Sequence, residues 1–252
     1  MPLLEAVLTG QLMAVALVFA RIGTALMVLP GFGEVQIPAR VRLLLGLVVS
    51  LGLAPATPVP PVPPSELGLV AGTLGAEVTI GLWIGLSGRT LLAALHFAGS
   101  QIALTAGLSN AFAAGPGAFE GSTAIAGFLL IAATAAIFAT DTHHLMIRAL
   151  LYSYDILPFG RLMLADMARE FTRVVSGSLY LGLTLAAPFF VMGLLLNLGL
   201  GLANRMMASL PVFFVAASGL IAAGFFVLAL AVPAILDAFV ARFAEWLGRL
   251  SF

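Results

Sequence analysis

The sequence contains no cysteine and no lysine, and only 9% of its 252 residues are charged. Without cysteine the chain can form no disulfide, thiolate nucleophile or cysteine-ligated metal site. Without lysine it can offer neither a phosphate-loop lysine to a nucleotide nor a Schiff base to a carbonyl. The 11 basic residues are all arginines and balance 11 acidic residues, so no basic tail or patch favours nucleic-acid binding. These absences exclude several classes of enzyme and a role on nucleic acid.

What the chain does contain is mostly apolar, with 62% hydrophobic residues and a mean hydropathy of +1.15, far above ordinary soluble domains. A helix of about 20 apolar residues crosses a hydrocarbon core about 30 Å thick. Long apolar segments occupy 6–29, 67–88, 174–203 and 210–236, and shorter ones occupy 43–56, 91–106 and 124–140. The short segments must tilt, kink or pack inside protein, because a half-length helix leaves polar ends in hydrocarbon. The pattern predicts an all-α polytopic membrane protein with seven hydrophobic segments.

Turn-forming sequences separate these segments, and they lie at 30–40, 54–66, 107–123, 157–161 and 204–211. The proline run at 55–64 predicts an extended connector. An outside N-terminus with seven spans, and 144–157 as an interfacial helix, places nine of the eleven arginines on the cytoplasmic side. The N-terminal stretch lacks a basic leader, which favours a retained first helix. We therefore predict one membrane domain over 1–252, ending in a helical hairpin.

Three polar residues, Arg21, Glu77 and Asn197, lie in or near the ends of apolar segments. An ionised group there costs about 3 kcal/mol, so each is expected to have a partner. A buried structural pair or a snorkelling side chain is favoured over interhelical assembly contacts, and both over a proton or ion relay, which needs more titratable groups. The sequence leaves open whether Glu77 pairs with Arg21 or with another chain.

Small residues recur at helical spacing beside these polar groups. Gly81, Gly85 and Gly88 follow Glu77 along one helix face, and Asn197 stands between Gly193 and Gly201 at intervals of four. Small residues at this spacing let another helix backbone approach closely. Both patterns predict helix packing rather than an active site.

The sequence DTHH at 141–144 is the only cluster that resembles a metal site. Adjacent histidines on a helix point about 100° apart, so the ligand geometry is poor and we predict no metal site. No Ser-His-Asp arrangement can be assembled, and GAFEGST at 117–123 lacks the spacing and the lysine of a phosphate loop. The sequence predicts neither catalysis nor a cofactor.

Several stretches occur together in the order found in one known family. They are ARIGTALMVLPGFGEVQIPARVRLLLGLVVSLGLAP at 20–55, EVTIGLWIGL at 77–86, HFAGSQIALTAGLSNAF at 96–112, HHLMIRALLYSYDILPFG at 143–160 and APFFVMGLLLNLGLGLANRMMASLPVF at 187–213. The chain resembles the FliR family, a core membrane component of the flagellar type III protein export gate, related to the T subunits of injectisomes. The stretch at 143–160 is more similar to the flagellar than to the injectisome branch. After GLS, where many relatives carry an acidic-proline-glutamine sequence, this chain has AAGPGAFEGST.

The resemblance implies a bacterial inner-membrane protein of the flagellar basal body, partly raised toward the periplasm. It implies a gate in which one such chain completes a helical ring of five FliP-like and four FliQ-like subunits, built from kinked helical hairpins. Residues 1–173 are similar to the P subunit and 174–252 to the Q-subunit hairpin. FlhA-like and FlhB-like export proteins, unfolded protein substrates and membrane lipid are the other implied partners. The residues expected in helix packing and assembly are Arg21, Arg40, Glu77, Gly81, Gly85, Asn197 and Gly201.

The family places the loop that corresponds to 107–123 inside the pore, as a plug that holds the gate closed. The resemblance assigns this role here to Gly107, Asn110, Phe112, Pro116, Phe119 and Glu120. Backbone that is neither helix nor strand is tolerated at membrane depth only when it is buried in protein or lines a wet cavity. The alternative functions are a small-solute secondary transporter using Arg21, Glu77 and Asn197, and, more remotely, an intramembrane enzyme. Such transporters often show paired repeats, which the sequence lacks.

Overall fold

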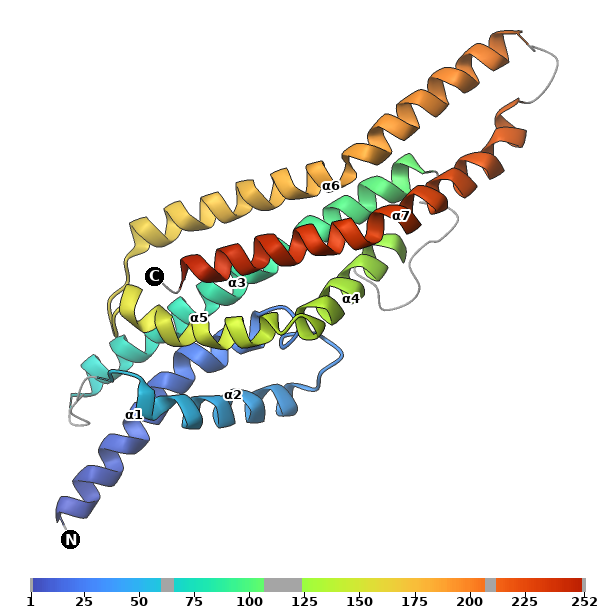
Figure 1. The fold of residues 1–252 in the computed structure, drawn as a ribbon. Coiled ribbons are helices and arrows are strands. Elements are labelled where there is room, and N and C mark those ends of the chain that lie inside the picture. The colour runs from blue at the N-terminus through green and yellow to red at the C-terminus, as the bar shows by residue number, and fades with distance from the viewer. Residues whose placement is uncertain (1, 60–65, 107–123, 207–211, 251–252) are drawn as a thin grey trace. The chain divides into compact units, whose positions relative to one another are not determined.

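The computed structural model describes residues 2–59, 66–106, 124–206 and 212–250, and within these ranges it is helical and contains no strand (Figure 1). The elements are α1 (Pro2–Val28), α2 (Ala39–Leu53), a short 3-10 helix η1 (Ala54–Ala56), α3 (Leu67–Thr105), α4 (Ala124–Ala139), α5 (Thr142–Ile156), α6 (Leu164–Met206) and α7 (Val212–Arg249). The all-α prediction is confirmed. Pro188 in α6 and Pro233 in α7 each remove a backbone donor from the helix interior, a common cause of kinks.

Within the described ranges, five helical stretches are long and apolar enough to cross a membrane, and the bent pair α4 and α5 would make a sixth. The five stretches are Gly10–Val28, Ala39–Ala56, Leu67–Thr105, Leu164–Met206 and Gly219–Arg249. The polytopic prediction is confirmed, but the count of seven segments is wrong. Segments 67–88 and 91–106 form one helix of 39 residues, because Gly88, Arg89 and Thr90 lower the hydropathy without interrupting the backbone hydrogen bonds.

The connector after α2 differs from the sequence-based expectation in its first residues, while Thr57 is extended. The prolines from Pro55 onward predict an extended connector. Instead, Ala54–Ala56 form one turn of 3-10 helix, closed by a hydrogen bond from the Thr57 N–H to the Ala54 carbonyl. Proline is tolerated in the first turn of a helix, where its missing donor is not needed. Residues 60–65 lie outside the described part of the chain.

The chain forms two compact units. Unit 1 consists of 1–90, 137–175 and 242–252, and unit 2 consists of 91–136 and 176–241. Of the charged residues in the sequence, only Glu120, Arg205 and Asp237 belong to unit 2. Nearly all the charge therefore belongs to unit 1.

In unit 1, α2 packs beside α1, as the two blue helices of Figure 1 show. Glycines make the contact close: a Cβ on Gly46 would lie 3.2 Å from Gly23 Cα. The core around α1 contains Leu17, Ile22 and Leu29, all fully buried. This packing leaves one side of α1 free to meet α3.

Unit 2 is also built on close contacts between small residues. A Cβ on Gly99 would come 2.5 Å from Ala126 Cα, and one on Gly224 would come 2.5 Å from Ala106 Cβ. Similarly, a Cβ on Gly182 would lie 2.9 Å from the Ala94 carbonyl oxygen. Interfaces of this kind are typical of membrane helices, which gain little from hydrophobic burial against lipid and associate through close packing.

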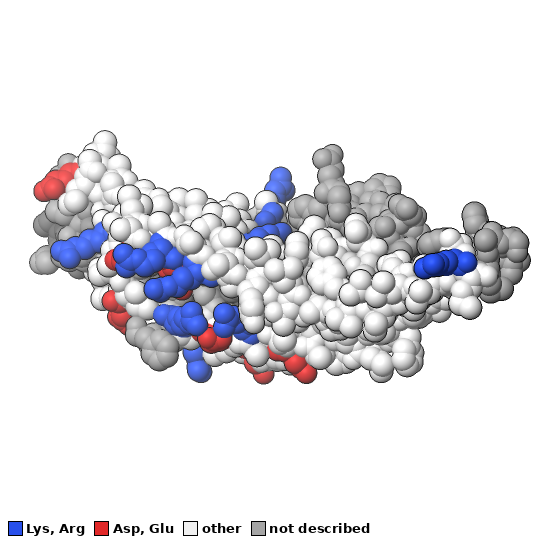
Figure 2. Space-filling view, turned by 90° about the horizontal axis from the view of Figure 1, so that it is seen from above, with Lys and Arg blue, Asp and Glu red and all other residues white. Residues whose placement is uncertain are grey.

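Large apolar faces remain uncovered. In the most apolar stretches, only 11% of α2 and 17% of α7 is buried inside the chain. On the face seen in Figure 2, arginines and carboxylates gather in one region, and most of the other described surface is uncharged. Exposed apolar surface of this extent needs lipid or partner proteins to cover it.

Candidate functional site: a buried arginine and glutamate beside a pocket

Arg21 on α1 and Glu77 on α3 form an ion pair inside unit 1, and neither side chain is exposed to any extent. Arg21 Nε donates to Glu77 Oε2 over 2.6 Å and Nη2 donates to Oε1 over 3.1 Å. This two-bond geometry is the strongest arrangement available to an arginine and a carboxylate. The sequence leaves open which group pairs with Glu77, and the structure places its partner within the same chain.

The other donors of Arg21 bind the end of α5. Nη1 donates to the Ser153 carbonyl at 3.1 Å and to the Ser153 hydroxyl at 3.3 Å, and Nη2 donates to the Leu157 carbonyl at 2.8 Å. The Ser153 carbonyl also accepts the Leu157 N–H at 2.9 Å. Carbonyls at the C-terminus of a helix carry partial negative charge, so a cation there is favourable. Arg21 therefore joins three segments, and all five of its N–H groups have an acceptor.

Glu77 holds the turn that follows α5. Its Oε1 accepts a hydrogen bond of 3.0 Å from the Gly160 N–H, and Gly160 has a φ of +69°. The left-handed region is readily adopted by glycine and disfavoured for residues with a Cβ. Tyr154 and Phe159 stack with ring centroids 4.6 Å apart, and the Arg21 guanidinium carbon lies 4.0 Å from the Tyr154 centroid. The cluster is thus a clamp on 153–160 whose charged groups already have partners.

The glycine line on α3 faces α1 and sets the spacing that this pair needs. A Cβ on Gly81 would overlap the Arg21 carbonyl oxygen and the Thr24 hydroxyl, and one on Gly85 would lie 2.7 Å from Val28 Cβ. One on Gly88 would lie 2.8 Å from Leu29 Cδ2. The two backbones approach closely enough for Glu77 to reach Arg21 because these three positions carry no side chain.

The other residues expected in assembly are on the surface. Arg40 is exposed at the start of α2. On α6, Asn197 is exposed and its amide nitrogen donates to the Gly193 carbonyl at 2.8 Å, while a Cβ added to Gly201 would meet no atom within 4 Å. The six plug-loop residues, Gly107, Asn110, Phe112, Pro116, Phe119 and Glu120, lie outside the described residues.

The structure gathers the residues of the DTHH sequence more closely than their helical spacing suggests. Asp141, with φ 56°, precedes α5, and one ligand atom each from Asp141, His143 and His144 lie within 4.8 Å of one another. His144 Nδ1 is 3.6 Å from Asp141 Oδ1, and these two side chains are 64% and 78% exposed. The contact suits an exposed ion pair when the histidine is protonated, so the geometry by itself does not require a metal.

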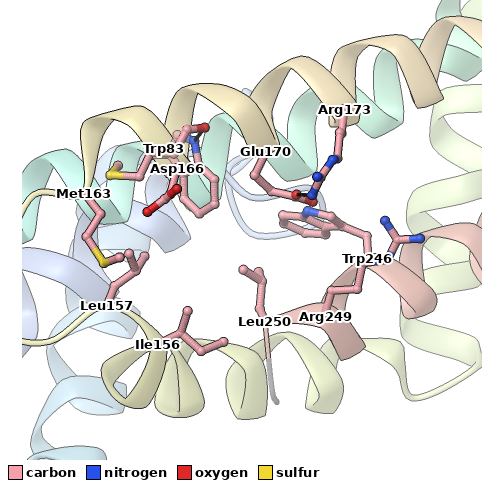
Figure 3. Close-up of a pocket in the computed structure, with 11 residues that line it drawn as sticks. Trp83, Ile156, Leu157, Met163, Asp166, Glu170, Arg173, Trp246, Arg249 and Leu250 are labelled. Atoms are coloured by element: carbon pink, nitrogen blue, oxygen red, sulfur yellow. Dashed lines mark hydrogen bonds and ion pairs between the residues drawn. The ribbon is translucent and has the colours of Figure 1, made fainter.

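A pocket of ≈ 500 Å³ lies beside the clamp in unit 1 (Figure 3). It shares Leu157 with the clamp, and both tryptophans of the chain, Trp83 and Trp246, line it. The Trp83 indole N–H donates to the Met167 carbonyl at 3.0 Å, whereas the Trp246 indole nitrogen is buried without a partner among the described residues. This pocket was not predicted from the sequence. Two lone tryptophans near arginine-rich segments are the signal that could have indicated it, because tryptophan and arginine concentrate at membrane interfaces.

Comparison with known proteins places this architecture in a family. The model of the family described as bacterial export proteins, family 1, matches residues 12–246. The chain is 40% identical over 240 residues to a flagellar biosynthetic protein FliR of Caulobacter vibrioides, covering 94% of this chain and 95% of that protein. It is 32% identical over 220 residues to a protein of the same name from Pectobacterium carotovorum, covering 86% and 83%. With the FliR protein of Escherichia coli K12 it shares 30% identity over 200 residues, 79% and 74% of the two chains. The chain therefore belongs to bacterial export protein family 1, the family of the flagellar biosynthetic protein FliR.

Proposed function

We propose that the chain is a non-enzymatic core subunit of the flagellar type III protein export gate. With FliP-like and FliQ-like subunits it forms the channel through which unfolded flagellar proteins leave the cytoplasm. The observation that carries the proposal is the family match over residues 12–246 in a chain whose apolar helices are largely uncovered. A helix packed only within its own chain would bury far more of its apolar surface.

The face of α6 illustrates the need for partners. Leu194, Leu195 and Leu198 are each more than half exposed, and the same face continues to Leu202. Lipid can cover leucine, but Asn197 and Gly201 on the same helix are the residue types that membrane helices use to contact one another. We assign this surface to a neighbouring subunit of the gate.

The proposal includes the wider setting that the family suggests. FlhA-like and FlhB-like export proteins would be the other protein partners. The location would be the inner membrane within the flagellar basal body, with part of the assembly raised toward the periplasm. Residues 1–173 would take the place of a P-like part and 174–252 that of a Q-like hairpin.

A transport role for the charged pair is less well supported. A relay or ion site needs a group that can exchange its partner, but the five donors of Arg21 all bind protein acceptors within one cluster. Glu77 in turn is bonded to Arg21 and to the Gly160 N–H. This arrangement favours a structural clamp over a small-solute transporter.

Expression of the tagged chain together with the P-like and Q-like subunits of the same genome tests the main proposal. The chain is expected to elute with both partners in one complex of defined mass, and to form no such complex when either partner is omitted. A chain that stays monomeric with both partners present would contradict the proposal. Substrate-specific, gradient-driven uptake by the purified chain in vesicles would favour the transporter instead.

The plug role of residues 107–123 is a separate part of the proposal. Deletion of 109–121 is expected to leave assembly intact and to raise the leakage of ions through the reconstituted complex. An equal-length replacement by a glycine-serine segment tests whether side chains or mere length hold the gate closed. Unchanged leakage through an intact complex would contradict a plug at this position.

A further inference from the structure

The pocket in unit 1 combines an apolar wall with charges of both signs (Figure 3). In this view Met163 and Leu157 lie toward one end, and Glu170, Arg173 and Trp246 lie toward the other. Two lining residues are acidic, Asp166 and Glu170, and two are basic, Arg173 and Arg249. Glu170 and Arg173 bring both signs of charge together, and Asp166 adds a second carboxylate nearer Met163. A ligand for this pocket should therefore be partly apolar and carry both charges.

One buried polar group in the pocket wall has no hydrogen-bond partner among the described residues. Trp246 is only 5% exposed, and its indole nitrogen forms no hydrogen bond with any described residue. Trp83 provides a comparison in the same pocket, because its N–H is bonded to the Met167 carbonyl. Buried donors in proteins are nearly always paired, and leaving one unpaired costs stability. The Trp246 N–H is left without an acceptor among the described residues, and because Trp246 lines the pocket, a bound molecule that reaches this buried nitrogen can supply one.

The charged side chains at the pocket are already paired with one another or with neighbours. Arg173 Nη1 lies 2.9 Å from Glu170 Oε2, and Arg249 Nη2 lies 2.7 Å from Glu245 Oε1. A purely anionic ligand would have to compete with these carboxylates for the arginines. A zwitterionic ligand avoids this competition. Its anionic group binds the arginine, and its cationic group binds the carboxylate that the arginine has released.

The pocket also lies where two candidate spans end. The α6 stretch begins at Leu164 and the α7 stretch ends at Arg249, and residues next to both ends line the pocket. The ends of membrane spans meet the headgroup layer, where tryptophan and arginine concentrate. A molecule entering here from the membrane would present its headgroup to the charged end.

From these observations we propose that the pocket binds one phospholipid with a phosphoethanolamine headgroup. A phosphate oxygen accepts the Trp246 N–H and contacts Arg173 or Arg249, and the ammonium group donates to the carboxylates of Asp166 and Glu170. The acyl chains begin on the apolar wall that contains Leu157. A volume of ≈ 500 Å³ suits a headgroup with the first part of its chains.

A peptide segment from a partner protein could also supply a carbonyl acceptor and an apolar side chain. It would not require charges of both signs around a single unpaired donor, nor a position at the ends of two spans. The lipid is therefore the occupant that the pocket chemistry favours, and occupation by a protein segment is an outcome that the test can detect.

The test uses the fluorescence of the full chain, because its only two tryptophans both line the pocket. The chain is reconstituted in bilayers containing a small fraction of lipid with brominated acyl chains, which quench nearby indoles. Phosphatidylethanolamine, phosphatidylcholine and phosphatidylglycerol are compared at equal mole fraction, so that ordinary surrounding lipid sets the baseline. Unlabelled phosphatidylethanolamine and water-soluble glycerophosphoethanolamine serve as competitors.

Brominated phosphatidylethanolamine is expected to quench the indole fluorescence more strongly than brominated phosphatidylcholine or phosphatidylglycerol. Addition of unlabelled phosphatidylethanolamine is expected to remove this additional quenching. Trp246→Phe keeps an aromatic ring and removes the N–H donor, and Trp83 remains as the fluorescent reporter. The preference for phosphatidylethanolamine, measured by quenching of Trp83, should weaken about tenfold, which is the effect of losing one hydrogen bond to a charged acceptor. Trp83→Phe is the matched control and should keep the preference. Glu170→Gln should weaken it without altering either indole. If glycerophosphoethanolamine reduced the quenching at the same concentration as the unlabelled lipid, the proposal of a bound lipid would be contradicted. The ligand would then be a solute the size of the headgroup.

Equal quenching by all three lipids would overturn the proposal, as would stronger quenching by phosphatidylglycerol. Repeating the measurement on the assembled complex with its partner subunits detects a protein occupant: protection from every brominated lipid there would assign the pocket to a partner segment. Native mass spectrometry gives an independent count. One retained phosphatidylethanolamine per wild-type chain, lost in Glu170→Gln at an unchanged melting temperature, supports the proposal even if Trp246→Phe fails to fold, and equal retention by both would contradict it.

Discussion

Arg21 Nε lies 2.6 Å from Glu77 Oε2, in a position where neither side chain is exposed. The two residues are 56 positions apart in the sequence and join α1 to α3. Arg21 also binds the carbonyls of Ser153 and Leu157, so one guanidinium holds three parts of unit 1 together. Because the two charges are fully buried and paired with each other, the loss of either one leaves the other buried and uncompensated.

We expect Glu77→Ala to destabilise the chain by about 3–5 kcal/mol, the usual cost of removing one partner of a buried ion pair. The substitution leaves the Arg21 charge buried and the Gly160 N–H without its acceptor. The measurement is the midpoint of unfolding in detergent, followed by indole fluorescence, with the level of protein in the membrane as a second readout.

The pair of Arg242 and Glu245 is the control for this prediction. It is a contact of 2.7 Å at the surface, with 41% and 49% of the side chains exposed, so Arg242→Gln should change stability by less than about 1 kcal/mol. The double substitution Arg21→Met with Glu77→Leu should recover much of the loss, because it removes both charges and fills a similar volume. A loss in the double variant equal to the sum of the two single losses would contradict the coupling.

Gly160→Ala is expected to destabilise the turn by about 1–2 kcal/mol, because Gly160 has a φ of +69° and a Cβ disfavours that region. Space is not the obstacle, since the nearest atom to an added Cβ is Thr73 Cγ2 at 3.4 Å, an ordinary contact. Gly160→Asn should therefore lose less than Gly160→Ala despite its larger side chain. If the two variants ranked by size instead, the effect would be steric and this explanation would be wrong. Thermal unfolding of the two variants side by side decides it.

The sequence predicts the long apolar helices well, because hydropathy reports directly on residues that avoid water. It fails where a polar residue lies in a continuous helix. Arg89 lowers the apolar average of α3, yet its side chain reaches Glu34 at 3.5 Å and the backbone hydrogen bonds continue past it. The start of α6 was missed for a related reason. Its first turns carry exposed ion pairs at helical spacing, such as Arg173 with Glu170, which hydropathy treats as loop.

The pairing of Arg21 with Glu77 and the pocket could not be predicted from the sequence. Arg21 and Glu77 both signal a need for a partner, but the spacing of two helices cannot be read from either helix alone. The bonds from Arg21 to backbone carbonyls at the end of α5 depend on no particular side chain. The pocket likewise depends on where α3, α5, α6 and α7 place single residues, among them the two tryptophans.

We expect Gly85→Ala to destabilise unit 1 by about 1–3 kcal/mol, as overpacking of a close contact usually does. The new Cβ would lie 2.7 Å from Val28 Cβ and 3.0 Å from the Ala25 carbonyl oxygen, and neither atom is the end of a flexible side chain. Gly75→Ala on the same helix is the matched control, since no atom lies within 4 Å of its Cβ and alanine favours helix by about 1 kcal/mol. Equal unfolding midpoints for the two variants would contradict a packing seam between α1 and α3.

The last prediction concerns the surface of α6 that we assign to a neighbouring subunit. Gly193 lies against Thr105, the last residue of α3, and Asn197 and Gly201 continue the same line beyond that contact. If the line meets another subunit, Asn197→Leu and Gly201→Leu should leave the level of the isolated chain unchanged. Each should lower the fraction in the complex by about three- to tenfold, the range expected for one polar or close contact between membrane helices.

The matched control for that surface is Gly199→Leu, the same change two residues away. Gly199 also has no atom within 4 Å of its Cβ, but it points about 160° away from Gly201 around the helix axis. It should leave assembly with the P-like and Q-like subunits intact. If α6 faces only lipid here, Asn197→Leu would instead raise the level of the chain and leave assembly unchanged, because leucine is better solvated by hydrocarbon than an amide is. Quantitative co-purification of each variant with the P-like and Q-like subunits separates a surface that binds a subunit from one that merely meets the membrane.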